Sequence, residues 1–379
     1  MLRAETRHDA DFHLTVSADA AKRGGRATRT VFDEVAAKIR ASGAEPIAEK
    51  IYGRVRAKDR ILAARRAAFM RRGLDVELPA TFVEGRPVHG GDLAGVQVWG
   101  IRAGSLKKNP VTTVRHRAGG VSRSWEDEGS RFLYLSSVQG TARDDRSPAN
   151  RPRQAERMYR NAALALRELD ASFADVVRTW IYLRDITAWY GKFNAVRSGL
   201  FRSADFLGKR RLAVPPASTG IEGRDSRGEC LMDLLAVIPG PRGTVRVEPI
   251  VKTSRQGSAL SYGSAFSRGI VLQVGKKRTV YVSGTASIDA AGASLHPDDP
   301  ELQALETLMN IAALLAERGG GLADIVSATL FCKDRRAFEA YHRVRRLLSI
   351  PEIPVVAVLA DVCRPDLLVE IEAVAVLGG

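Results

Sequence analysis

The chain has 379 residues, of which 45% are hydrophobic, so it can bury a core without disulfides or metal ions. Its three widely spaced cysteines, Cys230, Cys332 and Cys363, fit neither a disulfide framework nor a zinc site, and we expect a reducing compartment with no metal or other cofactor. No apolar run reaches the about 18 residues of a membrane span. The N-terminal residues lack the apolar core of a secretion signal, which predicts a cytoplasmic protein.

The formal net charge of +15 is compatible with nucleic acid, an acidic surface or an anionic substrate as partner. The basic residues are dispersed, however, and many are arginines in helix-like stretches such as 61–72. No recognisable nucleic-acid-binding module accompanies them. We therefore attribute most of the excess charge to solvated faces, and expect a small anionic substrate as the partner rather than nucleic acid or a membrane.

The pattern before residue 130 is the weakest part of the chain. Residues 30–73 are typical of two helices, interrupted near Gly43 and Pro46, and residues 94–101 are typical of a strand. Residues 107–128 resemble a loop. We predict a basic helical extension over residues 1–90.

An internal repeat begins near residue 130. Gln154 and Asn161 recur 149 residues later as Gln303 and Asn310, in the same order and between similar apolar runs. Such correspondence indicates two copies of one supersecondary unit. We therefore predict two tandem domains, over residues 91–245 and 246–379.

Within each copy the order is strand, helix, strand, helix, strand. The second copy shows it most clearly, with a helix over 301–318, a strand over 327–332, a helix over 337–348 and closing strands over 354–361 and 367–377. The predicted fold class is α+β, in which each domain is a mixed sheet covered by two helices on one face.

The last predicted strand places Glu370 and Glu372 on one face, because side chains alternate along a strand. If both are buried, each carboxylate opposes the ionisation of the other, and a carboxyl group kept protonated near neutral pH can act as a general acid. A solvated or subunit-facing sheet face with two ordinary acids is the alternative. An offset of 137 residues places Asp233 and Leu235 at these positions in the first copy, so only the second copy would carry a working site.

The repeated unit resembles the YjgF/RidA superfamily, whose small α+β domains have a chorismate mutase-like fold and form trimers with ligand sites at the interfaces. The segments YVSGTA at 281–286 and LLVEIEA at 367–373 carry this likeness. Because two such units follow one another in the chain, it resembles in particular the chorismatases, enzymes that remove pyruvate from chorismate. Further chorismatase-like stretches are 178–182, Tyr190 with Phe193 and Arg197, 216–220, 255–256, 262–263 with Phe266 and Arg268, 283–288, and 360–364.

The resemblance implies a cofactor-independent enzyme that cleaves the enolpyruvyl ether of chorismate or of a related cyclohexadiene carboxylate, with Glu370 as the general acid. In the branch that forms 3-hydroxybenzoate, a cysteine at the position of Cys363 is tied to a ring step, and Arg364 beside it could lower the pKa of the thiol. A small buried hydrophobic residue is the alternative for Cys363. The implied substrate-binding residues are Arg178, Arg197, Tyr262, Gly263, Phe266, Arg268, Ser283, Gly284, Thr285, Ala286, Arg364 and Glu372.

Other activities of the superfamily remain alternatives. Its imine deaminases hold the substrate carboxylate with an arginine on the penultimate strand, but this chain has Val355 there and an equivalent near Ser218 in the first copy. An apolar side chain cannot replace a guanidinium. The turn at 289–296 also departs from the chorismatase pattern. An imine or enamine deaminase, a related enzyme of secondary metabolism, and a non-catalytic ligand- or RNA-binding protein stay open, as does a trimer-like homo-oligomer.

Overall fold

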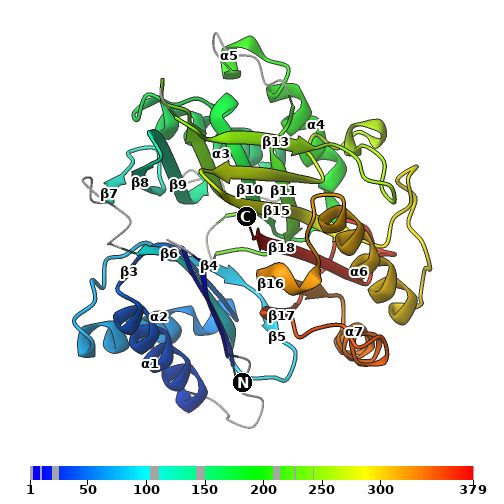
Figure 1. Ribbon diagram of the computed structural model, residues 1–379, viewed down its shortest axis with the longest axis horizontal. Coiled ribbons are helices and arrows are strands. Elements are labelled where there is room, and N and C mark those ends of the chain that lie inside the picture. The colour runs from blue at the N-terminus through cyan, green and yellow to red at the C-terminus, as the bar shows by residue number, and fades with distance from the viewer. Residues whose placement is uncertain are drawn as a thin grey trace.

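The computed structural model describes residues 3–8, 11–18, 25–102, 111–141, 150–207, 214–225, 228–241 and 243–378. Three sheets face one another across a shared core, and helices cover their outer faces (Figure 1). None of the helices in these ranges combines the length and apolar composition that a bilayer span demands.

The first unit is built from the N-terminal residues. Its five-stranded sheet has the order β1-β2-β6-β3-β4, and its two helices pack on one face through apolar residues at helical spacing, among them Val31, Val35 and Ile39 of α1. The elements are β1 (Arg3–His8), β2 (Asp11–Ser17), α1 (Gly25–Ser42), β3 (Ala44–Gly53), α2 (Lys58–Arg71), β4 (Thr81–Glu84) and β6 (Leu93–Arg102).

This unit corrects the prediction of a helical extension. The two predicted helices are present, but they cover a complete sheet, and β6 continues that sheet across the predicted boundary at residue 90. The strand β3 was missed because it contains Pro46 and carries Glu49 and Lys50, two charged residues that are buried in the folded chain. Buried charge hides the alternation by which a strand is recognised.

The second unit is a six-stranded sheet of order β11-β10-β12-β9-β8-β7. The predicted loop over 107–128 is wrong where it can be compared: residues 107–110 lie outside the described residues, and the remainder contains β7 and β8. The elements are β7 (Thr112–Arg115), β8 (Val121–Asp127), β9 (Ser130–Gln139), α3 (Arg151–Arg167), β10 (Val176–Leu183), α4 (Tyr190–Leu200), α5 (Ala204–Leu207), β11 (Ala217–Glu222) and β12 (Cys230–Ile238).

The third unit follows the predicted order of elements. Its sheet has the order β13-β14-β15-β18-β16-β17-β5, in which the short strand β5 (Arg86–Pro87) is supplied by the first unit. The other elements are β13 (Arg246–Ile250), β14 (Gly269–Val274), β15 (Lys277–Ala286), α6 (Pro300–Ala316), β16 (Ile325–Cys332), α7 (Arg335–Leu347), β17 (Val355–Leu359) and β18 (Val369–Leu377). Short 3-10 helices lie at Val55–Ala57 (η1), Phe173–Asp175 (η4), Ile186–Ala188 (η5), Ala259–Tyr262 (η6) and Leu322–Asp324 (η7).

All three sheets share one topology, so the chain contains three related units rather than two. In each unit the closing strand (β6, β12 or β18) pairs antiparallel with a middle strand (β3, β10 or β16). That middle strand also pairs in parallel with the next strand of the unit, β4, β11 or β17. The α+β class and the mixed sheets covered by two helices are confirmed. The copy formed by the first unit could not be recognised from the sequence, because its residues have diverged although its topology has not.

The ladders also correct the predicted alignment of the copies. Asp233 pairs with Trp180, whereas Glu372 pairs with Thr329, and Trp180 and Thr329 are 149 residues apart like the repeated Gln and Asn. Asp233 is therefore the counterpart of Glu372, and Leu231 is the counterpart of Glu370. The hydrogen bonds agree, because the repeated glutamines accept from the backbone N–H of Glu229 and of Leu368, two residues before these positions. The predicted offset between the two copies was two residues too small. An error of two keeps each residue on the correct face of its strand but assigns it the wrong counterpart in the other copy.

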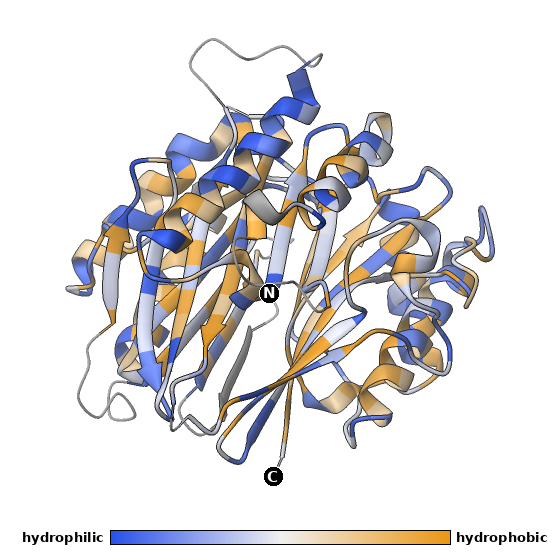
Figure 2. Cartoon of the chain, turned by 90° about the horizontal axis from the view of Figure 1, so that it is seen from above, coloured by the Kyte–Doolittle hydropathy of each residue, from blue (hydrophilic) through white to orange (hydrophobic). Residues whose placement is uncertain are grey.

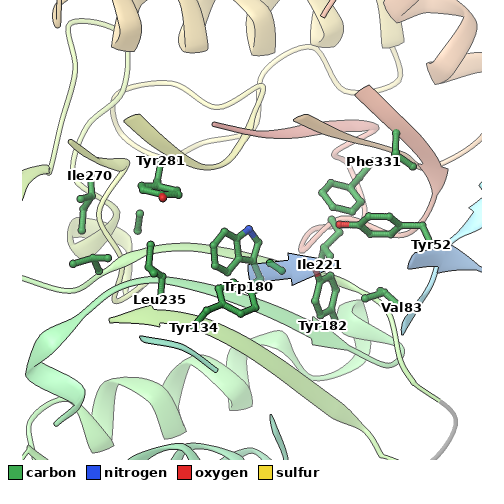
Figure 3. Close-up of a cluster of buried hydrophobic side chains, with 14 of the residues drawn as sticks. Tyr52, Val83, Tyr134, Trp180, Tyr182, Ile221, Leu235, Ile270, Tyr281 and Phe331 are labelled. Atoms are coloured by element: carbon green, nitrogen blue, oxygen red, sulfur yellow. The ribbon is translucent and has the colours of Figure 1, made fainter. Parts of the chain in front are cut away.

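One central core joins the three units. Tyr52 and Val83 from the first unit, Trp180 and Tyr182 from the second, and Phe331 from the third belong to a single buried cluster (Figure 3). Three further clusters lie between each sheet and its own helices. Hydrophobic residues accordingly follow the strands, and hydrophilic residues follow the outer surfaces of the helices (Figure 2). The sheet faces that the three units turn toward one another are thus buried within one chain.

Candidate active site

A cavity that contains Glu370 lies between the second and third units. The second unit supplies one wall through Tyr190 and Arg197 of α4 and through Ser218 and Gly220 of β11. The third unit supplies the rest of the lining: Tyr262, Ser264, Phe266, Arg268, Gly284, Ala286, Ile288, Cys363, Arg364, Leu367 and Glu370.

Glu370 lies on β18 and is 4% exposed, and Glu372 is 5% exposed. The alternative of a solvated sheet face is therefore wrong. Burial, together with the charge of the neighbouring Glu372, raises the pKa of the Glu370 carboxyl to about 8, and Arg178 opposes the shift in part. At neutral pH most Glu370 carboxyl groups carry a proton, as general acid catalysis requires.

Gly284 of β15 makes room for the Glu370 carboxyl. A Cβ atom at this position would lie 2.1 Å from Oε1 of Glu370, far inside contact distance, and 3.3 Å from Cγ2 of Thr219. A larger residue at this position would have to displace the carboxyl group, so glycine leaves room for it where it stands.

Three arginines and two aromatic rings alternate along the cavity. The guanidinium carbons of Arg197 and Arg268 lie 5.7 Å and 5.6 Å from the ring centroid of Phe266. Those of Arg268 and Arg364 lie 5.4 Å and 5.5 Å from the centroid of Tyr262. The aromatic faces hold the cations in place without neutralising them, so the cavity keeps its positive charge.

Two of these guanidinium groups have unused hydrogen-bond donors. Nε of Arg197 and Nη2 of Arg268 have no hydrogen-bond partner among the described residues, although each side chain is only 2% exposed. Buried donors of this kind are normally satisfied, in particular when they belong to a charged group. Arg364 is tied more firmly, because its Nη1 donates to the carbonyl oxygen of Gly292 and to Oγ of Ser294. The turn at 289–296, which departs from the chorismatase pattern, thus positions a cavity cation.

Cys363 lines the cavity, but its thiol is not activated. Burial, together with the proximity of Glu370, raises the pKa of the Cys363 thiol to about 12. Arg364 lowers this pKa as expected, but desolvation of the buried thiol outweighs the effect of the guanidinium. A protonated thiol is a poor nucleophile, and the arrangement favours a small apolar lining residue.

Five of the predicted substrate-binding residues lie outside the lining. Nη2 of Arg178 donates to Oε2 of Glu372 at 2.9 Å and to Oγ1 of Thr219 at 2.6 Å, in a separate cavity within the central core. This buried ion pair joins the second unit to the third. Ser283 also joins them, since its Oγ donates to the carbonyl oxygen of Ser267 and accepts from the backbone N–H of Ser218.

The two remaining predicted residues have local structural roles. Oγ1 of Thr285 donates to the carbonyl oxygen of Ser283. Gly263 ends η6 with a φ of 84°, a conformation that glycine adopts without strain and that turns the chain toward Ser264 and Phe266. Their contribution to the cavity is indirect.

The structure adds lining residues that were not predicted: Tyr190, Ser218, Gly220, Ser264, Ile288 and Leu367. Tyr190 and the segment 216–220 lie in stretches that resemble the chorismatases, and this resemblance is the one feature of the sequence that could have indicated their place in the cavity. Their approach to Glu370, 150 or more residues away in sequence, depends on how the two units pack.

The residue that stands at the position of the deaminases' arginine also has to be reassigned. Val355 pairs with Ala328 and Ser218 pairs with Thr179, which are 149 residues apart, so Val355 and Ser218 are counterparts. The cavity lies between units, and therefore Ser218 rather than Val355 faces the Glu370 site. A serine provides no guanidinium, so the argument holds at the corrected position.

Three units of one α+β topology around a common core, with an acid and three arginines between two of them, define a trimer-like architecture within a single chain. The family model described as Endoribonuclease L-PSP matches residues 258–377. The RutC family protein UK114 of Drosophila melanogaster is 34% identical over 102 residues, which are 27% of this chain and 74% of that protein. The chain belongs to this family, the YjgF/RidA family.

Two solved structures illustrate the similarity. A chorismatase crystal structure matches 97% of this chain and 100% of its own, with a TM-score of 0.63 and 17% identity, a likeness of fold. RidA from an Antarctic Psychrobacter species matches 34% of this chain and 100% of its own, with 26% identity and a TM-score of 0.30. The first of these extends over all three units.

Proposed function

We propose that this protein is a cofactor-independent, chorismatase-like enzyme that hydrolyses the enolpyruvyl ether of chorismate or of a related cyclohexadiene carboxylate. The observation that carries the proposal is a carboxyl group with a pKa of about 8 in a cavity lined by three arginines. The similarity of fold to a chorismatase over nearly the whole chain supports it, although fold alone does not decide activity.

The proposed reaction needs one proton donor and one water. Glu370 protonates the terminal methylene carbon of the enol ether, which becomes a methyl group, and the adjacent carbon becomes an oxocarbenium ion. Water adds to that carbon and gives a hemiketal, while the Glu370 carboxylate accepts a proton from the attacking water. The hemiketal then collapses: the bond between its central carbon and the ring oxygen breaks, the ring oxygen takes up the proton that the hemiketal hydroxyl gives up, and pyruvate leaves with the ring alcohol. Glu370 ends the cycle protonated, as it began.

The arginines explain the choice of a dianionic substrate. Two carboxylates and three guanidinium groups form a favourable set in a cavity whose acid is neutral at the start of the reaction. The unused donors of Arg197 and Arg268 are the groups that we expect to bind the carboxylates. We assign Cys363 to the cavity wall rather than to a covalent step, because its thiol remains protonated.

Pyruvate release from chorismate tests the proposal, with ring products followed by mass spectrometry. Glu370→Gln is expected to abolish pyruvate release, by at least 1,000-fold, and to remain folded, because the amide preserves the shape of the protonated carboxyl. Asp366→Asn is the matched control, since this acid lies in the same loop and strand segment but is exposed. Pyruvate release by Glu370→Gln at the wild-type rate would remove the proposed role.

An imine or enamine deaminase is the second candidate, because the family match covers the third unit, which carries Glu370. Ser218 stands where the deaminases need an arginine, which weighs against it. Ammonia release from enamine substrates without pyruvate release from chorismate would select this candidate. Salt-sensitive RNA binding without any turnover would select a non-catalytic protein instead.

A further inference from the structure

A second cavity lies between the third and first units, at the place that corresponds to the Glu370 cavity. Its wall is formed by α7 and β17, the counterparts of α4 and β11. Arg345 lies in the last turn of α7 as Arg197 does in α4. Val355 and Ala357 take the places of Ser218 and Gly220, as the parallel ladders show.

The opposite wall of this cavity comes from the first unit. Ser17 pairs with Gly95 as Ala286 pairs with Glu370, so Ser17 and Ala286 are counterparts and each lines its own cavity. Gly95 thus stands where the third unit has Glu370. A Cβ atom on Gly95 would lie 2.8 Å from Cγ2 of Val356, so no larger side chain fits there. The proton donor of the Glu370 cavity has no counterpart at this place.

We propose that this second cavity binds a small aromatic or cyclic carboxylate without converting it. The cavity has a volume of about 230 Å³, and an apolar cavity of about 150 Å³ is enough to bind benzene. The Glu370 cavity is smaller, at about 50 Å³, so a ring substrate enters it only when the lining side chains move apart. A ligand with one six-membered ring therefore fits the second cavity as it stands.

Rings line the second cavity on one side. The His342 imidazole lies edge-on to Phe338, with centroids 4.4 Å apart, and edge-on to Tyr341 at 5.2 Å. His89 of the first unit approaches Phe338 at 5.2 Å, also edge-on. Such edges and faces are the surfaces on which a planar ring packs. All four residues line the cavity, so a ring bound there would contact both units.

Arg345 supplies the charge that would select a carboxylate. Its Nη1 donates to the carbonyl oxygen of Ile350 at 3.3 Å, and no ion pair with it exists among the described residues. Two acids also line the cavity: Asp92 is already paired with Arg60 at 2.9 Å, and Glu352 is exposed, so that solvent screens its charge. A bound metal ion is disfavoured, because the described residues contain no group of three His, Cys, Asp or Glu side chains suited to hold one. An organic anion with a ring is the ligand that this lining fits.

Equilibrium dialysis with 3-hydroxybenzoate and benzoate as probes tests the inference on the full chain. We expect Arg345→Ala to weaken binding at one site per chain at least ten-fold, and His342→Ala to weaken the same site. Arg346→Ala is the matched control, since Arg346 follows Arg345 in the same helical turn, is exposed and lies outside the lining. Neither Arg345→Ala nor Arg346→Ala should change pyruvate release at saturating substrate by more than two-fold.

The location is checked by NMR of the imidazoles. In an Arg268→Ala background, which impairs the Glu370 cavity, benzoate should still shift the ring signals of His89 and His342. Absence of those shifts, or the same binding isotherm for Arg345→Ala as for the wild type, would overturn the inference. The inference does not rest on the proposed function: a protein that binds both probes in this way but leaves chorismate intact would support the second site and reject the enzyme.

Discussion

Replacing Glu370 by glutamine should stabilise the protein, and increasingly so as the pH rises. The Glu370 carboxyl is buried beside Glu372 in the folded chain, and its pKa is raised from 4.5 to about 8. The folded state therefore binds a proton more tightly than the unfolded state. Stability that depends on this proton is fully present below pH 4.5 and is lost as the pH rises through 8. Glutamine cannot ionise, so the variant escapes this loss.

The size of the effect follows from the two pKa values. The interval between 4.5 and about 8, at about 1.4 kcal/mol for each pKa unit, corresponds to about 5 kcal/mol at pH 9. This figure is an upper bound, because a charged carboxylate can draw in water or relax toward the arginines. We expect the variant to gain about 2–4 kcal/mol over the wild type between pH 5 and pH 9.

Urea denaturation of both proteins at pH 5, 7 and 9 measures the gain. Lys50, whose pKa is lowered by burial to about 8, titrates in both proteins, so its contribution cancels in the difference. Asp366→Asn should change stability by less than about 0.5 kcal/mol at every pH. The reasoning is refuted if the difference between Glu370→Gln and the wild type is the same at pH 5 and pH 9, since Glu370 would then ionise normally in the fold.

Three further predictions concern the surroundings of Glu370. Gly284→Ala should lower pyruvate release at least 100-fold in a folded protein, because the new Cβ displaces the Glu370 carboxyl. Gly191→Ala is the control, since a Cβ at that position would have no atom within 4 Å. A fully active Gly284→Ala variant would contradict the packing. Arg178→Ala should destabilise the fold by about 3–5 kcal/mol, since it leaves Glu372 buried without its ion-pair partner; a urea midpoint within error of the wild type would exclude this. Cys363 should react with iodoacetamide more slowly than a free cysteine at pH 8. The rate should still rise above pH 9, because the pKa of the thiol is about 12. Rapid alkylation that does not depend on pH would instead show a thiolate.

The family's habit of forming trimers has a different meaning for this chain. The three units already bury against one another the sheet faces at which copies would associate. Both walls of the Glu370 cavity come from the same chain. A second copy is therefore not required to complete the site, and any homo-oligomer would have to form through other surfaces.

Much of the fold could be read from local pattern. Gln154 and Asn161 recur as Gln303 and Asn310 because each pair makes the same backbone contacts. The glutamines accept from the backbone N–H of the residue just before the closing strand, and the asparagines donate to the carbonyl oxygens of Gln139 and Ala286. Side chains with such specific partners leave a signal in the sequence. The first unit shows no such repeated side chains in its sequence, because its sheet is stabilised by backbone pairing and by buried residues of varied type, among them Lys50.

The sequence by itself determined the α+β class, the repeat and the acid at Glu370, since periodicity and local hydrogen bonding depend on neighbours along the chain. Only the tertiary structure decided that three units surround one core, that Asp233 matches Glu372, and that Ser218 rather than Val355 faces the acid. It also separated Arg178 and Glu372 from the cavity and left the Cys363 thiol protonated. These outcomes depend on which faces are buried together, and burial between units sets both the neighbours of an ionisable group and its pKa.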